Sequence, residues 1–83
     1  MPDLEELRQE IDRIDDEIRD LFLARLEIVQ NIATYKQENS LPISHPDREQ
    51  NILTRLTAGL SDKQAAELTK LYEEIFRISR DTQ

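Results

Sequence analysis

Residues 4–38 contain neither proline nor glycine, and their apolar side chains recur with alternating three- and four-residue spacing. This heptad spacing is typical of a helix that packs lengthwise along a partner helix. Asp3 and Glu6 form a capping box at the start of the segment. The apolar series is Leu4, Leu7, Ile11, Ile14, Ile18, Leu21, Ile28, Ile32 and Tyr35. We therefore predict one unbroken helix over about residues 4–38, roughly 50 Å long.

A helix of this length constrains the assembly, because a compact chain of 83 residues would be only about 25–30 Å across. One such chain cannot bury the whole stripe within itself. A second apolar stripe opens in the later half of the helix, so this half should be buried on two sides; its members are Phe22, Leu26, Val29 and Ala33. We expect a homodimer in which the long helices pack along one another and the chains intertwine.

The rest of the chain predicts two shorter helices after a linker at residues 39–47. Pro46 suits the first turn of a helix over about residues 46–58, and Gly59 is a natural residue to end it. Ser61 and Gln64 form a second capping box that opens a helix over about residues 62–82. The inward positions of these helices are Ile52, Leu53, Leu56, Leu68, Leu71, Tyr72, Ile75 and Phe76. The prediction is an all-α chain, with residues 1–83 forming one domain.

Composition and charge argue against several classes of function. The chain has 11 basic and 18 acidic residues, a net charge of −7, which disfavours nucleic acid and anionic membranes as partners. With no cysteine and a single histidine, a metal site or disulfide framework is not expected. No segment approaches the roughly 18 apolar residues of a membrane span, and the opening residues are acidic rather than signal-like. We expect a cytoplasmic protein.

Arg25 occupies the one position of the heptad series that is not apolar. A buried, unpaired arginine would cost several kcal/mol, so its presence on this face needs a reason. Lys36 lies eleven residues further on, three turns along almost the same face. Several helical cations lack an acid three or four residues away, although acids are abundant: Arg25, Lys36, Arg48, Arg55 and Arg80.

Three more polar side chains fall on apolar helix faces: Glu49, Ser79 and Gln83. Each polar residue has an ordinary explanation when taken alone. Arg25 could bond backbone carbonyls, Glu49 could be a first-turn acid, and the other two could be solvated near a helix end. Together they favour a shared polar pocket for an anionic ligand, and the planar guanidinium of Arg25 suits a carboxylate. We therefore expect the partner of Arg25 to be a ligand.

Four segments resemble the AroQ-class, all-helical chorismate mutases over essentially the whole chain: "LRQEIDRIDDEI", "ARLEIVQNIATYK", "DRE" and "SRDTQ". No single segment is specific, but their order and spacing are. The resemblance implies a three-helix chain in an intertwined homodimer with two equivalent sites. It also implies the [3,3] sigmatropic rearrangement of chorismate, a dicarboxylate, to prephenate in phenylalanine and tyrosine biosynthesis, without metal or cofactor.

The resemblance further implies roles for individual residues. Arg25 and Arg8 of the partner subunit would hold the two carboxylates. Lys36 would contact a carboxylate and the ether oxygen of the breaking bond, and Gln83 would donate to the same oxygen.

Four other positions would complete this site. Glu49 would bind the ring hydroxyl, and Arg48 and Ser79 would line the pocket. His45 stands ahead of Arg48 where the family usually has an acid or similar capping residue, so this chain departs from the pattern there.

Three alternatives stay open at this point. Two are enzymes on the same fold: a lyase that eliminates pyruvate from isochorismate, and an aminodeoxychorismate mutase. Such relatives tend to lose the acid at the Glu49 position, so this residue favours chorismate. The third is a non-catalytic helical dimerisation module, which would leave Glu49, Ser79 and Gln83 without a purpose.

Overall fold

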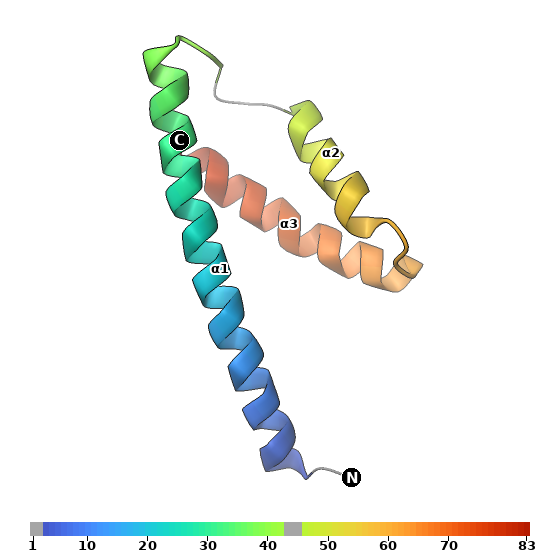
Figure 1. Cartoon of the computed structure of the whole chain (residues 1–83). Helices are drawn as coiled ribbons and strands as arrows, with labels where there is room; N and C mark the ends of the chain where they lie inside the picture. Colours follow the sequence, from blue (N-terminus) through green and yellow to red (C-terminus); the bar gives the residue numbers. More distant parts are fainter. Residues whose placement is uncertain (1–2, 43–45) are drawn as a thin grey trace.

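The computed structural model describes residues 3–42 and 46–83, and in these ranges it contains three α-helices and no strand (Figure 1). Helix α1 spans Leu4–Glu38, α2 spans Pro46–Thr57 and α3 spans Asp62–Thr82. The predicted all-α class, with one long and two shorter helices, is confirmed. Helix α2 ends one residue before the expected position.

Side-chain caps fix the start of α1 and of α3. The Asp3 carboxylate accepts a hydrogen bond from the backbone N–H of Glu6 at 2.9 Å. At α3 the capping box is complete: the Ser61 hydroxyl accepts from the N–H of Gln64 at 3.1 Å, and the Gln64 side chain accepts from the N–H of Ser61 at 3.3 Å. Both caps satisfy amides that the first helical turn leaves without partners.

A Schellman motif ends α1. The N–H of Leu41 donates to the carbonyl of Lys36 at 2.8 Å, and the N–H of Ser40 donates to the carbonyl of Gln37 at 3.3 Å. Ser40 has φ of 55°, the left-handed conformation that glycine usually supplies at this position. Gly59, with φ of 79°, takes the same conformation just after α2.

Helix α3 packs against both of the other helices (Figure 1). It crosses the second half of α1 and runs beside α2, whereas the first half of α1 extends away from both. The molecule measures 56 × 26 × 16 Å, so α1 sets its length. Among the described residues, the buried apolar side chains come one from each helix: Val29, Ile52 and Phe76. A core this small is marginal for a single chain.

The two apolar stripes of α1 have different surroundings. The second stripe, Phe22, Leu26, Val29 and Ala33, is buried or half-buried, and it lies on the half of α1 that α3 crosses. Every apolar member of the heptad series is between 43% and 71% exposed. Leu71 of α3, predicted to point inward, is also exposed in the single chain. This chain therefore covers only one of the two faces.

Candidate active site

A cavity of about 650 Å³ is lined by residues of all three helices. Helix α1 contributes its second half, α2 its first two turns and α3 its last two turns. Six of the eight site residues predicted from the sequence line this one cavity: Arg25, Lys36, Arg48, Glu49, Ser79 and Gln83. Its remaining lining is mostly apolar: Leu21, Ala24, Ile28, Val29, Ile32, Ile52, Phe76 and also Arg80.

Arg25 is held by two residues of α3. Its Nη1 donates to the hydroxyl of Ser79 at 2.6 Å, and its guanidinium carbon lies 5.8 Å from the ring centroid of Phe76. The Ser79 hydroxyl in turn donates to the carbonyl of Ile75 at 2.7 Å. The expectation that Arg25 finds its partner only in a ligand was wrong, because α3 crosses α1 at the level of this arginine. Both partners are uncharged, so they orient the guanidinium without neutralising it.

Lys36 and Gln83 meet at the end of the cavity where the C-terminal turn of α3 approaches α1. The Lys36 Nζ donates to Oε1 of Gln83 at 3.4 Å, and Nε2 of Gln83 donates to the carbonyl of Ser79 at 3.5 Å. The backbone N–H of Gln83 also donates to the Ser79 carbonyl at 3.3 Å, which holds the end of α3 in helical geometry. The side-chain contacts are long, so a ligand can replace them at small cost.

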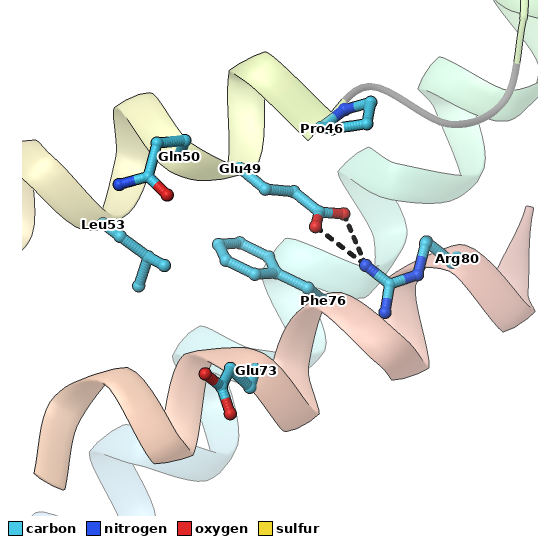
Figure 2. Close-up of a pocket in the computed structure, with 7 residues that line it drawn as sticks. All are labelled: Pro46, Glu49, Gln50, Leu53, Glu73, Phe76 and Arg80. Atoms are coloured by element: carbon cyan, nitrogen blue, oxygen red, sulfur yellow. Dashed lines mark hydrogen bonds and ion pairs between the residues drawn. The ribbon is translucent and has the colours of Figure 1, made fainter. Parts of the chain in front are cut away.

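Glu49 forms an ion pair with Arg80 across the interface of α2 and α3. The Arg80 Nη1 donates to both carboxylate oxygens of Glu49 at 2.8 Å, as Figure 2 shows. The Glu49 side chain is 28% exposed and that of Arg80 is 43% exposed. A second cavity of about 200 Å³ shares the ion pair and Phe76 with the larger one; its other lining residues are Pro46, Gln50, Leu53 and Glu73.

Arg80 is the polar site residue that sequence reasoning missed. The available signal was the absence of an acid three or four residues away, a feature that Arg80 shares with Arg25. That signal did not separate Arg80 from Arg55, which lies in the last turn of α2 and does not line the cavity. The acid that pairs with Arg80 lies 31 residues away in the sequence.

The other three predicted site residues are Arg48, Arg8 and His45, and the structure describes the positions of the first two. Arg48 lies in the first turn of α2 and lines the cavity, although it is exposed. Arg8 is exposed near the start of α1 and does not line it. At 1.5 Å per residue, Arg8 lies about 25 Å along the helix from Arg25 of the same chain. His45 lies outside the described residues.

The charges that line the cavity oppose the charge of the whole chain. Four cations and one acid line it, in a protein of net charge −7. Together with the apolar side chains of Ile32 and Ile52, they suit a small ligand that carries negative charge on a hydrophobic frame. Among residues 3–42 and 46–83, no group of three potential metal ligands comes together, and no helix is long and apolar enough to cross a membrane.

Comparison with known families agrees with this geometry. The model of the family described as chorismate mutase type II matches residues 7–83. The chain belongs to this family. The crystal structure of chorismate mutase from Helicobacter pylori in complex with prephenate is 47% identical and superposes with a TM-score of 0.81, over 95% of this chain and 87% of that one. All three helices of the present chain thus have counterparts in a solved chorismate mutase.

Curated relatives of the chorismate mutase family are longer proteins. The bifunctional chorismate mutase/prephenate dehydratase of Aquifex aeolicus is 43% identical over 56 residues, which are 68% of this chain and 16% of that protein. The chorismate mutase of Methanocaldococcus jannaschii is 36% identical over 53 residues, 64% of this chain and 54% of that protein. The chain therefore spans about half or less of the length of these relatives.

Proposed function

We propose that this chain is a chorismate mutase, which converts chorismate to prephenate by an intramolecular [3,3] rearrangement in phenylalanine and tyrosine biosynthesis. The observation that carries the proposal is the cationic cavity of a chain in the chorismate mutase type II family. The similar Helicobacter pylori enzyme is described in complex with prephenate. We further propose that residues 1–83 act as one catalytic domain, and a cytoplasmic location stays a prediction.

The first task of such a site is to hold a flexible dicarboxylate in its compact, reactive conformation. Arg25, which Ser79 and Phe76 already orient, is suited to bind one carboxylate through its planar fork. Arg8 of a second copy would bind the other carboxylate. Fixing both ends converts the search for the reactive conformer into a binding step, which is the main entropic route to rate acceleration.

The second task is to stabilise the negative charge that grows on the ether oxygen as its C–O bond breaks. Lys36 and Gln83 lie 3.4 Å apart at one end of the cavity, and both carry donors. Rotation of the Gln83 amide would aim its Nε2 at the same oxygen as the Lys36 ammonium. A donor placed in this way contributes roughly 10²–10³ in rate.

The remaining side chains are proposed to bind the polar edge of the substrate. Glu49 would accept a hydrogen bond from the ring hydroxyl, and Arg48 and Ser79 would complete the lining. A role for His45 at the entrance to α2 stays a prediction. The rearrangement moves electrons within one molecule, so the proposed mechanism asks these residues for binding and electrostatics, not for proton transfer.

A homodimer would cover the heptad face of α1, which is exposed in the single chain. From Leu4 to Ile28 the exposed heptad series is symmetric about residue 16: in an antiparallel pair of α1 helices centred there, Leu4 lies opposite Ile28 and Ile14 opposite Ile18. Leu7 of one copy lies opposite Arg25 of the other in this register. Each heptad position from Leu4 to Ile28 then meets another position of the series, as a two-fold interface requires, whereas Ile32 and Tyr35 lie beyond the paired segment.

The same register accounts for Arg8. In the antiparallel pair it lies opposite Ala24, a residue that lines the cavity beside Arg25. The second copy would therefore bring Arg8 to a site that its own chain cannot reach. Each of the two sites would contain residues of both chains.

Product identification tests this proposal. Chorismate is added to the purified protein and the products are followed by NMR, with isochorismate in a parallel sample. Prephenate from chorismate is the expected result. Pyruvate from isochorismate without prephenate would replace the proposal with the lyase, and no turnover of either substrate would favour the dimerisation module.

A further inference from the structure

The ion pair between Glu49 and Arg80, drawn in Figure 2, lines both cavities. Glu49 is the one acidic side chain among the described residues that line the larger cavity. That cavity also contains the cations of Arg25, Lys36, Arg48 and Arg80. A single carboxylate among several cations can neutralise only one or two of them. Because Glu49 pairs with Arg80, its charge does not neutralise Arg25.

Arg80 holds Glu49 on the side of α2 that faces α3. One nitrogen, Nη1, donates to both carboxylate oxygens at 2.8 Å, so a turn of the carboxylate toward α1 would weaken this pairing. Among the described residues, Arg25 meanwhile pairs with uncharged groups, the hydroxyl of Ser79 and the ring of Phe76. In this arrangement Glu49 neutralises Arg80, whereas the charge of Arg25 remains for a ligand.

We propose that Arg80 is a positioning residue that acts through Glu49. It fixes the Glu49 carboxylate where a substrate hydroxyl can reach it, and it prevents this carboxylate from pairing with the cations that bind the substrate. The inference rests on the proposed function and extends it to a residue outside the set that the resemblance assigns. Without Arg80, the substrate would first have to displace Glu49 from a cation of the site.

Two other roles of Arg80 make different predictions. If the pair only tethers α2 to α3, its loss should lower stability without a specific effect on turnover. If Arg80 binds a substrate carboxylate itself, its loss should reduce turnover whether or not Glu49 is charged. If it acts through Glu49, its loss should matter only while Glu49 carries a carboxylate.

The test compares six proteins: the parent, Arg80→Gln, Arg80→Lys, Glu49→Gln, the double variant with Arg80→Gln and Glu49→Gln, and Arg77→Gln. Arg77 is the matched control, because it lies on α3 and pairs with Glu74 at 2.9 Å and Asp81 at 3.3 Å on an exposed face. Initial rates of prephenate formation give kcat and KM, and thermal unfolding reports the fold.

We expect Arg80→Gln to lower kcat/KM by about 10- to 100-fold, the scale of a misplaced binding group. Arg80→Lys should recover part of this loss, since it restores a positive charge near Glu49. The decisive result is the double variant, which should match Glu49→Gln alone to within about twofold. Arg77→Gln should retain the kcat and KM of the parent.

Three results would overturn the inference. Arg80→Gln with the turnover of the parent would show that the pair is a tether. A further loss from Arg80→Gln in the Glu49→Gln background would show that Arg80 meets the substrate directly. A parent protein that forms no prephenate would overturn the proposed function together with this inference, whereas the first two results leave the function standing.

Discussion

The two halves of α1 carry the same heptad repeat in different surroundings. Every described residue from 3 to 20 is exposed, and this half of the helix extends away from α2 and α3 (Figure 1). In residues 21–38 the second stripe packs where α3 crosses, and the same segment carries Arg25 and Lys36 into the cavity. The second half of α1 is therefore packed on one of its two apolar faces, whereas the first half is packed on neither.

Under the proposed dimer, this difference would make the fold and the site depend on the same surface of a second copy. The second half of α1 carries Arg25, the proposed carboxylate-binding residue, but the heptad side chains of this half, Leu21, Ile28, Ile32 and Tyr35, stay exposed. The first half offers apolar side chains and Arg8 without a place for them in its own chain. If two copies join the unlike halves, the second copy completes the core and the site together.

The largest effect on assembly and activity is expected from a charged residue placed in the first half of α1. Ile14→Asp would bury a carboxylate near the centre of the proposed antiparallel pair, in both copies at once. Losing two buried isoleucines alone costs roughly 3–6 kcal/mol per dimer, before the penalty for the charges. We expect loss of association by analytical ultracentrifugation, lower helicity by circular dichroism and loss of both active sites.

Leu23→Asp is the matched control for this change. Leu23 is also an apolar residue of α1, and its exposed fraction of 54% equals that of Ile14, 55%, to within one point. It lies on the opposite face of the helix from the heptad series. The Leu23→Asp variant should therefore still form the dimer. An equal loss of association in Leu23→Asp and Ile14→Asp would contradict the assignment of the heptad face as the dimer interface.

The next effect concerns the second half, where Arg25→Ala removes a proposed substrate clamp. We expect kcat/KM to fall by about 10²–10³-fold or more, because a carboxylate of the substrate loses its cation. The fold should survive with a loss of about 1–2 kcal/mol, since only one hydrogen bond and one cation–π contact disappear. Initial rates and sedimentation of the variant check both points.

Arg19→Ala provides the comparison for Arg25. Arg19 lies on the same helix and is exposed beside Asp20, to which it donates at 3.0 Å. This variant should keep both activity and assembly. Dissociation of the Arg25→Ala dimer would show instead that Arg25 is a structural residue of the interface.

A mixing experiment tests directly whether Arg8 of one copy and Arg25 of the other form one site. Arg8→Ala and Arg25→Ala are each expected to be inactive as homodimers. If the chains exchange at random, about half of the dimers are mixed, and each mixed dimer has one intact site of two. Activity should therefore return to about a quarter of the parent value after joint refolding. If Arg8 served its own chain, no mixed dimer would contain an intact site and no activity would return.

Most of this architecture could be predicted because its signals are local. The caps at Asp3 and Ser61 and the apolar spacing lie within a few residues of the structures that they determine. The cavity members on apolar faces, such as Glu49 and Ser79, were visible because a polar residue on such a face breaks the pattern.

The contacts between helices could not be predicted in the same way. The pairing of Arg80 with Glu49, and of Arg25 with Ser79, depends on where α3 crosses the other two helices. The crossing is a property of packed side chains on separate segments, and no spacing within one helix encodes it. For the same reason, the single chain showed that Leu71 is exposed where the helical pattern had placed it inward.

The smallest effect is expected at the end of α1, away from the heptad face. Ser40 takes a left-handed conformation, with φ of 55°, that glycine adopts without strain. Ser40→Gly should stabilise the protein by about 0.5–1 kcal/mol, the strain relieved minus the larger chain entropy of glycine when unfolded. For a folded dimer of this size, that corresponds to a rise in Tm of roughly 1–4 °C.

Gly59→Ala is the reverse experiment at the end of α2. An added Cβ at Gly59 meets nothing within 4 Å, so its cost comes from φ of 79° alone and should be about 1 kcal/mol in the opposite direction. Thermal unfolding at one protein concentration measures both shifts, and neither variant should change the sedimentation of the dimer. A loss of stability in Ser40→Gly would mean that the serine side chain makes a contribution greater than the strain. Opposite shifts of similar size would show that local backbone geometry, and not contact with another helix, sets the stability of these two helix ends.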